Sequence, residues 1–179
     1  MSNHKAEIVQ RDHPVLRKKA MPVALEEIGS EKIRNIIRDM SEAMSEQKDG
    51  IAIAAPQIGV DLQIFVVSGT LLRQADASYT GEEGNIVFIN PKITKLSKDK
   101  KDMEEGCLSV RWLYGLVKRS TRATIKAYNE NGEKIERGAS GILAQIFQHE
   151  VDHLNGILFT DRTDEVWEMT AEEIKEIQK

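Results

Sequence analysis

The chain contains 179 residues, of which 40% are hydrophobic and 30% are charged. A chain of this length buries about 70% of its unfolded surface, so we expect a single domain that spans residues 1–179. The 25 basic and 29 acidic residues give a net charge of −4. This balance excludes a strong global attraction to nucleic acid, and we expect no direct binding to it.

The chain has a single cysteine, Cys107, which excludes an internal disulfide and suits a reducing compartment. Residues 1–19 lack the apolar run of a signal peptide, and no uncharged stretch is long enough to span a membrane. We therefore expect a cytoplasmic protein that makes no membrane contact.

The first half of the chain has three recognisable segments. Residues 30–47 carry apolar side chains three and four positions apart behind Ser30, which predicts a capped amphipathic helix. Residues 51–58 are apolar but contain Pro56, so we expect a buried loop and a short strand. Residues 68–85 are rich in glycine, serine, threonine and acidic residues, which is typical of a surface loop or a solvated hairpin.

Strand patterns occur at residues 63–67, 86–89 and 124–127, and the Asn131-Gly132 pair predicts a hairpin turn. Residues 98–102 mix charges without aromatic side chains, which indicates a solvated turn rather than an RNA contact.

A second helix should begin after Gly138, with Ser140 as its cap, and end near Asn155-Gly156. Residues 164–178 are also predicted to be helical. Short strands mixed with two clear helices favour an α+β domain over a doubly wound sheet.

The second predicted helix contains the sequence Gln-His-Glu-Val-Asp-His at residues 148–153. His149 and His153 are four residues apart and share one helix face, so both rings can bind one metal ion. Glu150 lies about 100° around the helix and can reach a water on that ion. The spacing also fits two ordinary half-buried histidines paired with Glu150 and Asp152. A tetrahedral catalytic site usually needs a third protein ligand.

Cys107 is a candidate for the third ligand and lies in the sequence EEGCLS, residues 104–109. A lone cysteine is more often a small buried apolar residue than a ligand. Here Gly106 allows close approach of the backbone, and Ser109 supplies a polar neighbour. One thiolate and two neutral imidazoles would leave a metal ion enough Lewis acidity to ionise water near neutral pH.

The sequence GIAIAAPQ at residues 50–57 combines small residues with a terminal amide. Small residues let the backbone approach a ligand, and Gln57 can donate a hydrogen bond to an oxyanion. A buried alanine-rich turn needs no substrate, so this segment by itself is weak evidence for a site.

The segments GIAIAAPQ, EGCLS and QHEVDHLNG occur in this order and resemble the three signature motifs of the peptide deformylases. The resemblance extends from the helix before Gly50 to the residues that follow the second helix, so it covers most of the chain. It implies an α+β domain in which the motif-bearing helix packs among antiparallel sheets. It also implies that the metal ligands are Cys107, His149 and His153, and that Glu150 is the catalytic acid and base.

The same resemblance implies that Gln57 and the backbone N–H of Leu108 donate to the oxyanion. It implies an ion pair between Glu105 and Arg119 that supports the strand bearing Cys107. The implied native metal is Fe(II), and Zn(II), Ni(II) or Co(II) could occupy the same ligands.

The implied reaction is hydrolysis of the N-formyl group from the N-terminal methionine of newly synthesised proteins, which releases formate. The implied partners are N-formylmethionyl nascent peptides and, transiently, the ribosome. We expect Gly50 and Ala52 to form a tight wall that admits a formyl group and rejects acetyl. We expect Ile142 and Ile146 to line an apolar pocket for the methionine side chain.

Two residues depart from the family's pattern. Ala52 stands where a second glycine is usual; it keeps the N–H but adds a methyl group. Arg111 stands where a proline usually follows the cysteine motif, and we expect residues 111–114 to reshape the rim of the pocket.

Two alternative functions stay open at this point. One is a zincin-like metallopeptidase that uses the same helix, with Glu165 or Glu168 as its third ligand. The other is a metal-binding or peptide-binding homologue without turnover.

Overall fold

The computed structural model describes residues 6–75, 77, 80–81 and 84–178. The described residues form two sheets in which every neighbouring pair of strands is antiparallel. The first sheet has the spatial order β1 (Ala52–Ala54), β2 (Ile64–Ser68), β3 (Asn85–Leu96), β6 (Arg122–Tyr128) and β7 (Lys134–Ser140). The second has the order β4 (Lys100–Gly106), β5 (Leu113–Ser120) and β8 (Val166–Glu168).

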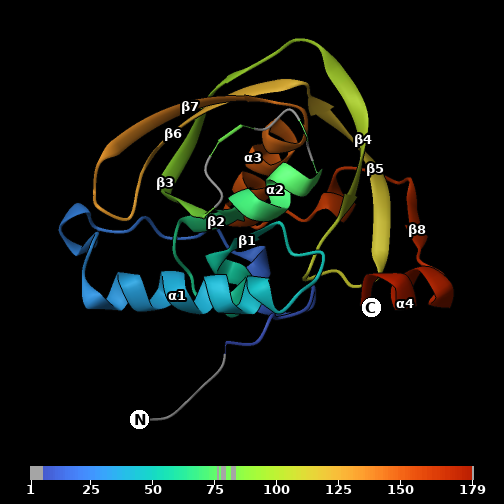
Figure 1. Ribbon diagram of the computed structural model, residues 1–179, viewed down its shortest axis with the longest axis horizontal. Coiled ribbons are helices and arrows are strands. Elements are labelled where there is room, and N and C mark those ends of the chain that lie inside the picture. The colour runs from blue at the N-terminus through green and yellow to red at the C-terminus, as the bar shows by residue number, and fades with distance from the viewer. Residues whose placement is uncertain (1–5, 76, 78–79, 82–83, 179) are drawn as a thin grey trace.

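The α-helices of the described residues are α1 (Glu31–Ser45), α2 (Gly69–Ala75), α3 (Gly141–Leu154) and α4 (Ala171–Gln178). In Figure 1, α3 lies near the centre beneath the long arching strands β3, β6 and β7, and α1 runs along the bottom of the view. This arrangement confirms the predicted α+β fold with a central helix among antiparallel sheets. None of the helices in the described residues is both long enough and apolar enough to cross a membrane.

Strand β2 is buried on both faces because a helix packs on each side of it. Phe65 and Val67 belong to a core cluster with Phe147 of α3. Ile64 and Val66 alternate with them and belong to a second cluster with Met40 of α1. Because strand side chains point alternately to opposite faces, one apolar run packs against both helices.

The capped first helix is confirmed. The Ser30 hydroxyl accepts a hydrogen bond from the Ile33 N–H at 3.3 Å, and α1 follows directly. The buried segment after it is also confirmed: β1 is followed by the 3₁₀ helix η3 (Ala55–Ile58), with Pro56 in its first turn.

Helix α3 begins after Ser140, as predicted, but the Ser140 side chain makes no capping hydrogen bond. The turn between β6 and β7 is the predicted hairpin turn, with Gly132 at φ 81°.

Two predicted elements are wrong in part. Within residues 68–85 we expected a loop or a solvated hairpin, but Gly69–Ala75 forms α2, and Leu72 is fully buried in the α3 cluster. Residues 76, 78–79 and 82–83 of that segment lie outside the described residues. Residues 164–178 are helical only from Ala171, since residues 166–168 pair with β5.

Strands β4 and β5 did not give a clear pattern in the sequence. The turn expected at residues 98–102 is shorter, because β4 already begins at Lys100. Charged side chains at Lys100, Lys101 and Asp102 are exposed on this strand, so it lacks an apolar alternation at its start. Both β1 and β4 are edge strands, and the candidate site lies between them.

Candidate metal centre and substrate pocket

Helix α3 presents His149 and His153 one turn apart, with ring centroids 4.9 Å from each other. Cys107 directly follows β4, and its Sγ lies 3.2 Å from His153 Nε2. One ligand atom from each of the three residues lies within 4.8 Å of the other two; no other such group occurs in the described part of the chain. Ligand atoms on a tetrahedral ion are separated by roughly 3.3–3.8 Å, so these three can share one metal ion.

A buried ion-pair network holds His149. Its Nδ1 lies 2.8 Å from Glu105 Oε2, which leaves Nε2 for a metal. Arg119 donates to both oxygens of Glu105, at 2.7 and 3.0 Å. Burial opposes ionisation of Glu105, but the hydrogen bonds from His149 and Arg119 outweigh it and lower the Glu105 pKa to about 2. The carboxylate is therefore charged and orients the imidazole.

The network continues through Arg162, which was not predicted from the sequence, and through Asp152, which pairs with arginines rather than with the histidines. Arg119 also donates to Asp152 Oδ2 at 2.7 Å. Arg162 donates to the two oxygens of Asp152 at 3.0 and 2.5 Å. The sequence contained one signal for Asp152, because it lies three residues after His149 and so shares its side of the helix.

Glu150 lies beside the ligands, is buried and lines the cavity. Burial raises its pKa to about 7, and its Oε2 has no hydrogen-bond partner among the described residues. A carboxyl group in this state can accept and release a proton near neutral pH.

Gln57 is held at both ends of its amide. Its Oε1 accepts from the Ala54 N–H at 2.8 Å, which directs its Nε2 toward the cysteine. That Nε2 donates to Ser109 Oγ at 3.2 Å and to Cys107 Sγ at 3.6 Å. The amide N–H is therefore aimed at the metal ligands, and Leu108 lines the same cavity.

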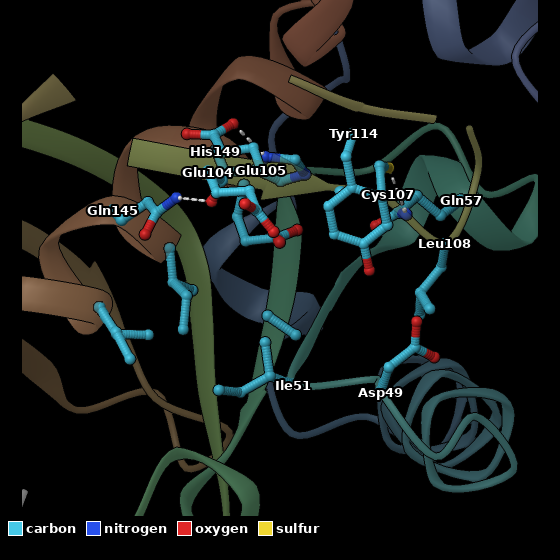
Figure 2. Close-up of a pocket in the computed structure, with 15 residues that line it drawn as sticks. Asp49, Ile51, Gln57, Glu104, Glu105, Cys107, Leu108, Tyr114, Gln145 and His149 are labelled. Atoms are coloured by element: carbon cyan, nitrogen blue, oxygen red, sulfur yellow. Dashed lines mark hydrogen bonds and ion pairs between the residues drawn. The ribbon is translucent and has the colours of Figure 1, made fainter. Parts of the chain in front are cut away.

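A cavity of about 280 Å³ opens beside these residues and is shown in Figure 2. It brings together Ala52, Ile142 and Ile146, as expected, but Gly50 is not among its lining residues. A side chain at Gly50 would lie 2.6 Å from the carbonyl oxygen of Met44, so packing against the end of α1 explains this glycine. Its predicted role as a substrate wall finds no support in the geometry.

Asp49, Glu104 and Gln145 line the cavity and were not predicted from the sequence, whereas Tyr114 belongs to the segment 111–114 that was expected at the rim. A side chain at Gly106 would lie 2.6 Å from the Tyr114 ring, so that ring occupies the space left by the glycine. Gln145 donates to the Glu104 carbonyl at 2.7 Å and thereby ties α3 to β4. Asp49 lines the rim, where Arg111 contacts it.

The ligand set of the metallopeptidase alternative does not form. Glu165 and Glu168 are exposed, and neither belongs to the group of metal-ligating side chains found in the described residues.

Comparisons with a family model and with related sequences point to the same family. The model of the polypeptide deformylase family matches residues 5–168. Peptide deformylase 2 of Clostridium acetobutylicum is 44% identical over 151 residues, which cover 84% of this chain and 90% of that protein. The peptide deformylase of Halothermothrix orenii is 44% identical over 156 residues, covering 87% and 91%.

Solved structures agree with the relatives. The crystal structure of the Thermotoga maritima peptide deformylase has a TM-score of 0.77 and 35% identity, and the match covers 90% of this chain and 99% of that one. The Acinetobacter baumannii class I type b enzyme with Met-Ala-Ser bound has a TM-score of 0.77 and 33% identity, covering 87% and 96%. Neither alternative function is favoured by these matches. The chain belongs to the polypeptide deformylase family, the metal-dependent enzymes that remove the N-formyl group from N-terminal methionine.

Proposed function

We propose that Cys107, His149 and His153 bind Fe(II) and that N-formylmethionyl peptides are hydrolysed beside them. One observation carries this proposal: a sulfur and two imidazoles lie within 4.8 Å of one another, next to a buried carboxyl group. When bound, the ion would polarise the formyl carbonyl and lower the pKa of water. Zn(II), Ni(II) or Co(II) would fit the same donors, because cysteine and histidine suit several metals.

The electrostatics of the three ligands support a cation at this place. Burial opposes protonation of His149, but hydrogen bonds with Cys107 and Glu105 outweigh it and raise the His149 pKa well above its ordinary value. The surroundings of His149 thus favour the positive charge that its extra proton brings. A metal ion can supply the positive charge in place of that proton. Burial and the nearby His149 lower the pKa of His153, so its ring is neutral and has a lone pair to donate.

Glu150 is the residue that we propose to move the proton. Its position beside the ligands and its pKa of about 7 suit a group that takes a proton from the attacking water. The same carboxyl group would then deliver the proton to the amine of the departing methionine.

Gln57 and Leu108 are the proposed oxyanion donors. The hydrogen bond from Ala54 holds the Gln57 amide so that its N–H faces Cys107 before substrate arrives. A donor arranged in advance in this way is typically worth about 3 kcal/mol of transition-state stabilisation. We propose that the Leu108 N–H donates to the same oxygen.

The peptide backbone would bind between two unpaired strand edges. β1 and β4 are edge strands of different sheets, and Ala52 and Gly106 both line the cavity between them. An extended peptide can add to such edges through main-chain hydrogen bonds. The Acinetobacter baumannii relative binds Met-Ala-Ser, which supports the proposal that this chain also binds a peptide. The methionine side chain would pack on Ile142 and Ile146; contact with the ribosome stays a prediction.

The test is formate release from formyl-Met-Ala by the iron-loaded protein, prepared without air. We expect formate from the wild type. We also expect Cys107→Ala to lose both bound metal and turnover, because two imidazoles alone leave the site one ligand short. Full retention of metal by this variant would contradict the proposed ligand set.

The role of Glu150 can be separated from metal binding with Glu150→Gln. We expect this variant to keep its metal, because Glu150 is not a proposed ligand, and to lose about 10²–10⁴-fold in kcat. Metal content and formate release should be measured on the same preparation. Wild-type kcat in Glu150→Gln would show that another group moves the proton.

A further inference from the structure

Two walls of the cavity lie beside edge strands of different sheets, and α3 lines the cavity from a third side. Asp49, Ile51 and Ala52, where the chain enters β1, form one wall, and residues 104–108 at the end of β4 form the other. Figure 2 shows Asp49 and Ile51 in the lower part of the view, with Cys107 and Tyr114 above them. A peptide held between these walls must fit their separation.

Arg111 lies in the loop that follows the second wall and is bonded to the first wall at the rim. Its Nη1 and Nη2 donate to the two oxygens of Asp49 at 2.5 and 3.0 Å, and Nη2 also donates to Gln47 Oε1 at 2.9 Å. The Arg111 and Asp49 side chains are only 18% and 22% exposed. A forked pair of this kind is directional, and its partial burial reduces screening by water.

Arg111 is itself held in place. Its guanidinium lies 4.6 Å from the centre of the Trp112 ring, a cation–π distance. Gln10 accepts from the Arg111 N–H at 3.5 Å and donates to the Leu108 carbonyl at 3.1 Å. These contacts fix the Arg111 guanidinium at the rim, away from the proposed oxyanion donors.

We propose that Arg111 is a positioning residue for the peptide. Through Asp49 and Gln47 it sets the separation of the two walls, and with it the affinity for the residues that follow formyl-methionine. This role rests on the proposed function, because it requires a peptide between β1 and β4. Arg111 does not contact the proposed metal ligands, so its loss should change substrate affinity rather than metal binding.

The test compares a long and a short substrate, formyl-Met-Ala-Ser and formyl-Met, on the iron-loaded enzyme. We expect Arg111→Gln to raise KM for the long substrate about 10-fold with kcat within about 2-fold, since it removes binding that is uniform between ground and transition states. KM for formyl-Met should change by less than about 2-fold, because the short substrate reaches fewer wall residues.

Two further variants test whether the ion pair is responsible. Asp49→Asn should raise the same KM, and the double variant Asp49→Asn with Arg111→Gln should be no worse than either single one, because both remove one interaction. Arg111→Lys should lie between wild type and Arg111→Gln, since lysine keeps the charge but lacks the fork. Arg38→Gln is the matched control, because it removes exposed ion pairs between Arg38 and two carboxylates on α1.

Unchanged KM for formyl-Met-Ala-Ser in Arg111→Gln would overturn the positioning role. An equal rise in KM for both substrates, or a loss of bound metal, would overturn it as well, because either result indicates general disruption. If the wild type releases no formate from either substrate, the proposed function fails first and the positioning role fails with it.

Discussion

Two of the forked arginine–carboxylate pairs near the candidate site, Arg119 with Glu105 and Arg111 with Asp49, have different surroundings. The Arg119 and Glu105 side chains are 6% and 2% exposed, and Glu105 contacts the proposed ligand His149. The Arg111 and Asp49 side chains lie at the rim and are partly in contact with water. A buried charge that loses its partner is strongly destabilising, but water can replace a partner at the rim. We therefore expect the inner pair, Arg119 with Glu105, to affect stability and metal binding. We expect the outer pair, Arg111 with Asp49, to affect substrate affinity.

The largest expected effect is that of Arg119→Ala on stability. This change leaves the Glu105 and Asp152 carboxylates buried with one partner fewer, which typically costs about 3–5 kcal/mol. Urea unfolding of the metal-free protein measures the loss. A loss below about 1 kcal/mol, the range of exposed pairs, would remove the distinction between the inner and outer arginines.

An intermediate effect is expected for Glu105→Gln on metal affinity. Glutamine can still bond to His149 but lacks the charge that makes the imidazole a stronger ligand, so affinity should fall about 10–100-fold. Competition between the protein and a chelator for Co(II) measures this without turnover. Equal affinity in variant and wild type would mean that His149 needs no orientation by the carboxylate.

The smallest effect is expected for Arg111→Gln on stability, less than about 1 kcal/mol in the same urea experiment. The Asp49 carboxylate that loses its partner is 22% exposed, so water can solvate it. If this variant unfolds as easily as Arg119→Ala, the rim pair is a structural element and the comparison between the pairs fails.

Local signals predicted α1, α3 and the hairpin between β6 and β7 correctly, since each depends on neighbouring residues. Helix periodicity, a capping serine and an Asn-Gly turn act within a few positions. The segments that were predicted wrongly depend on contacts with residues far away in the sequence. Leu72 forms part of a helix because it packs into the α3 cluster, and residues 166–168 form a strand because β5 offers an edge.

The sequence by itself determined that His149 and His153 share a helix face with Glu150 between them, because helix geometry sets the spacing of residues four apart. It also supplied the three motifs that indicate the family. The family resemblance implied that Cys107 joins His153, 46 positions away, but the spacing of residues did not, and the tertiary structure brings them together. Only the tertiary structure decided that Arg111 meets Asp49, 62 positions away. Such contacts depend on how two sheets pack around α3, and the spacing of residues along a chain does not specify that packing.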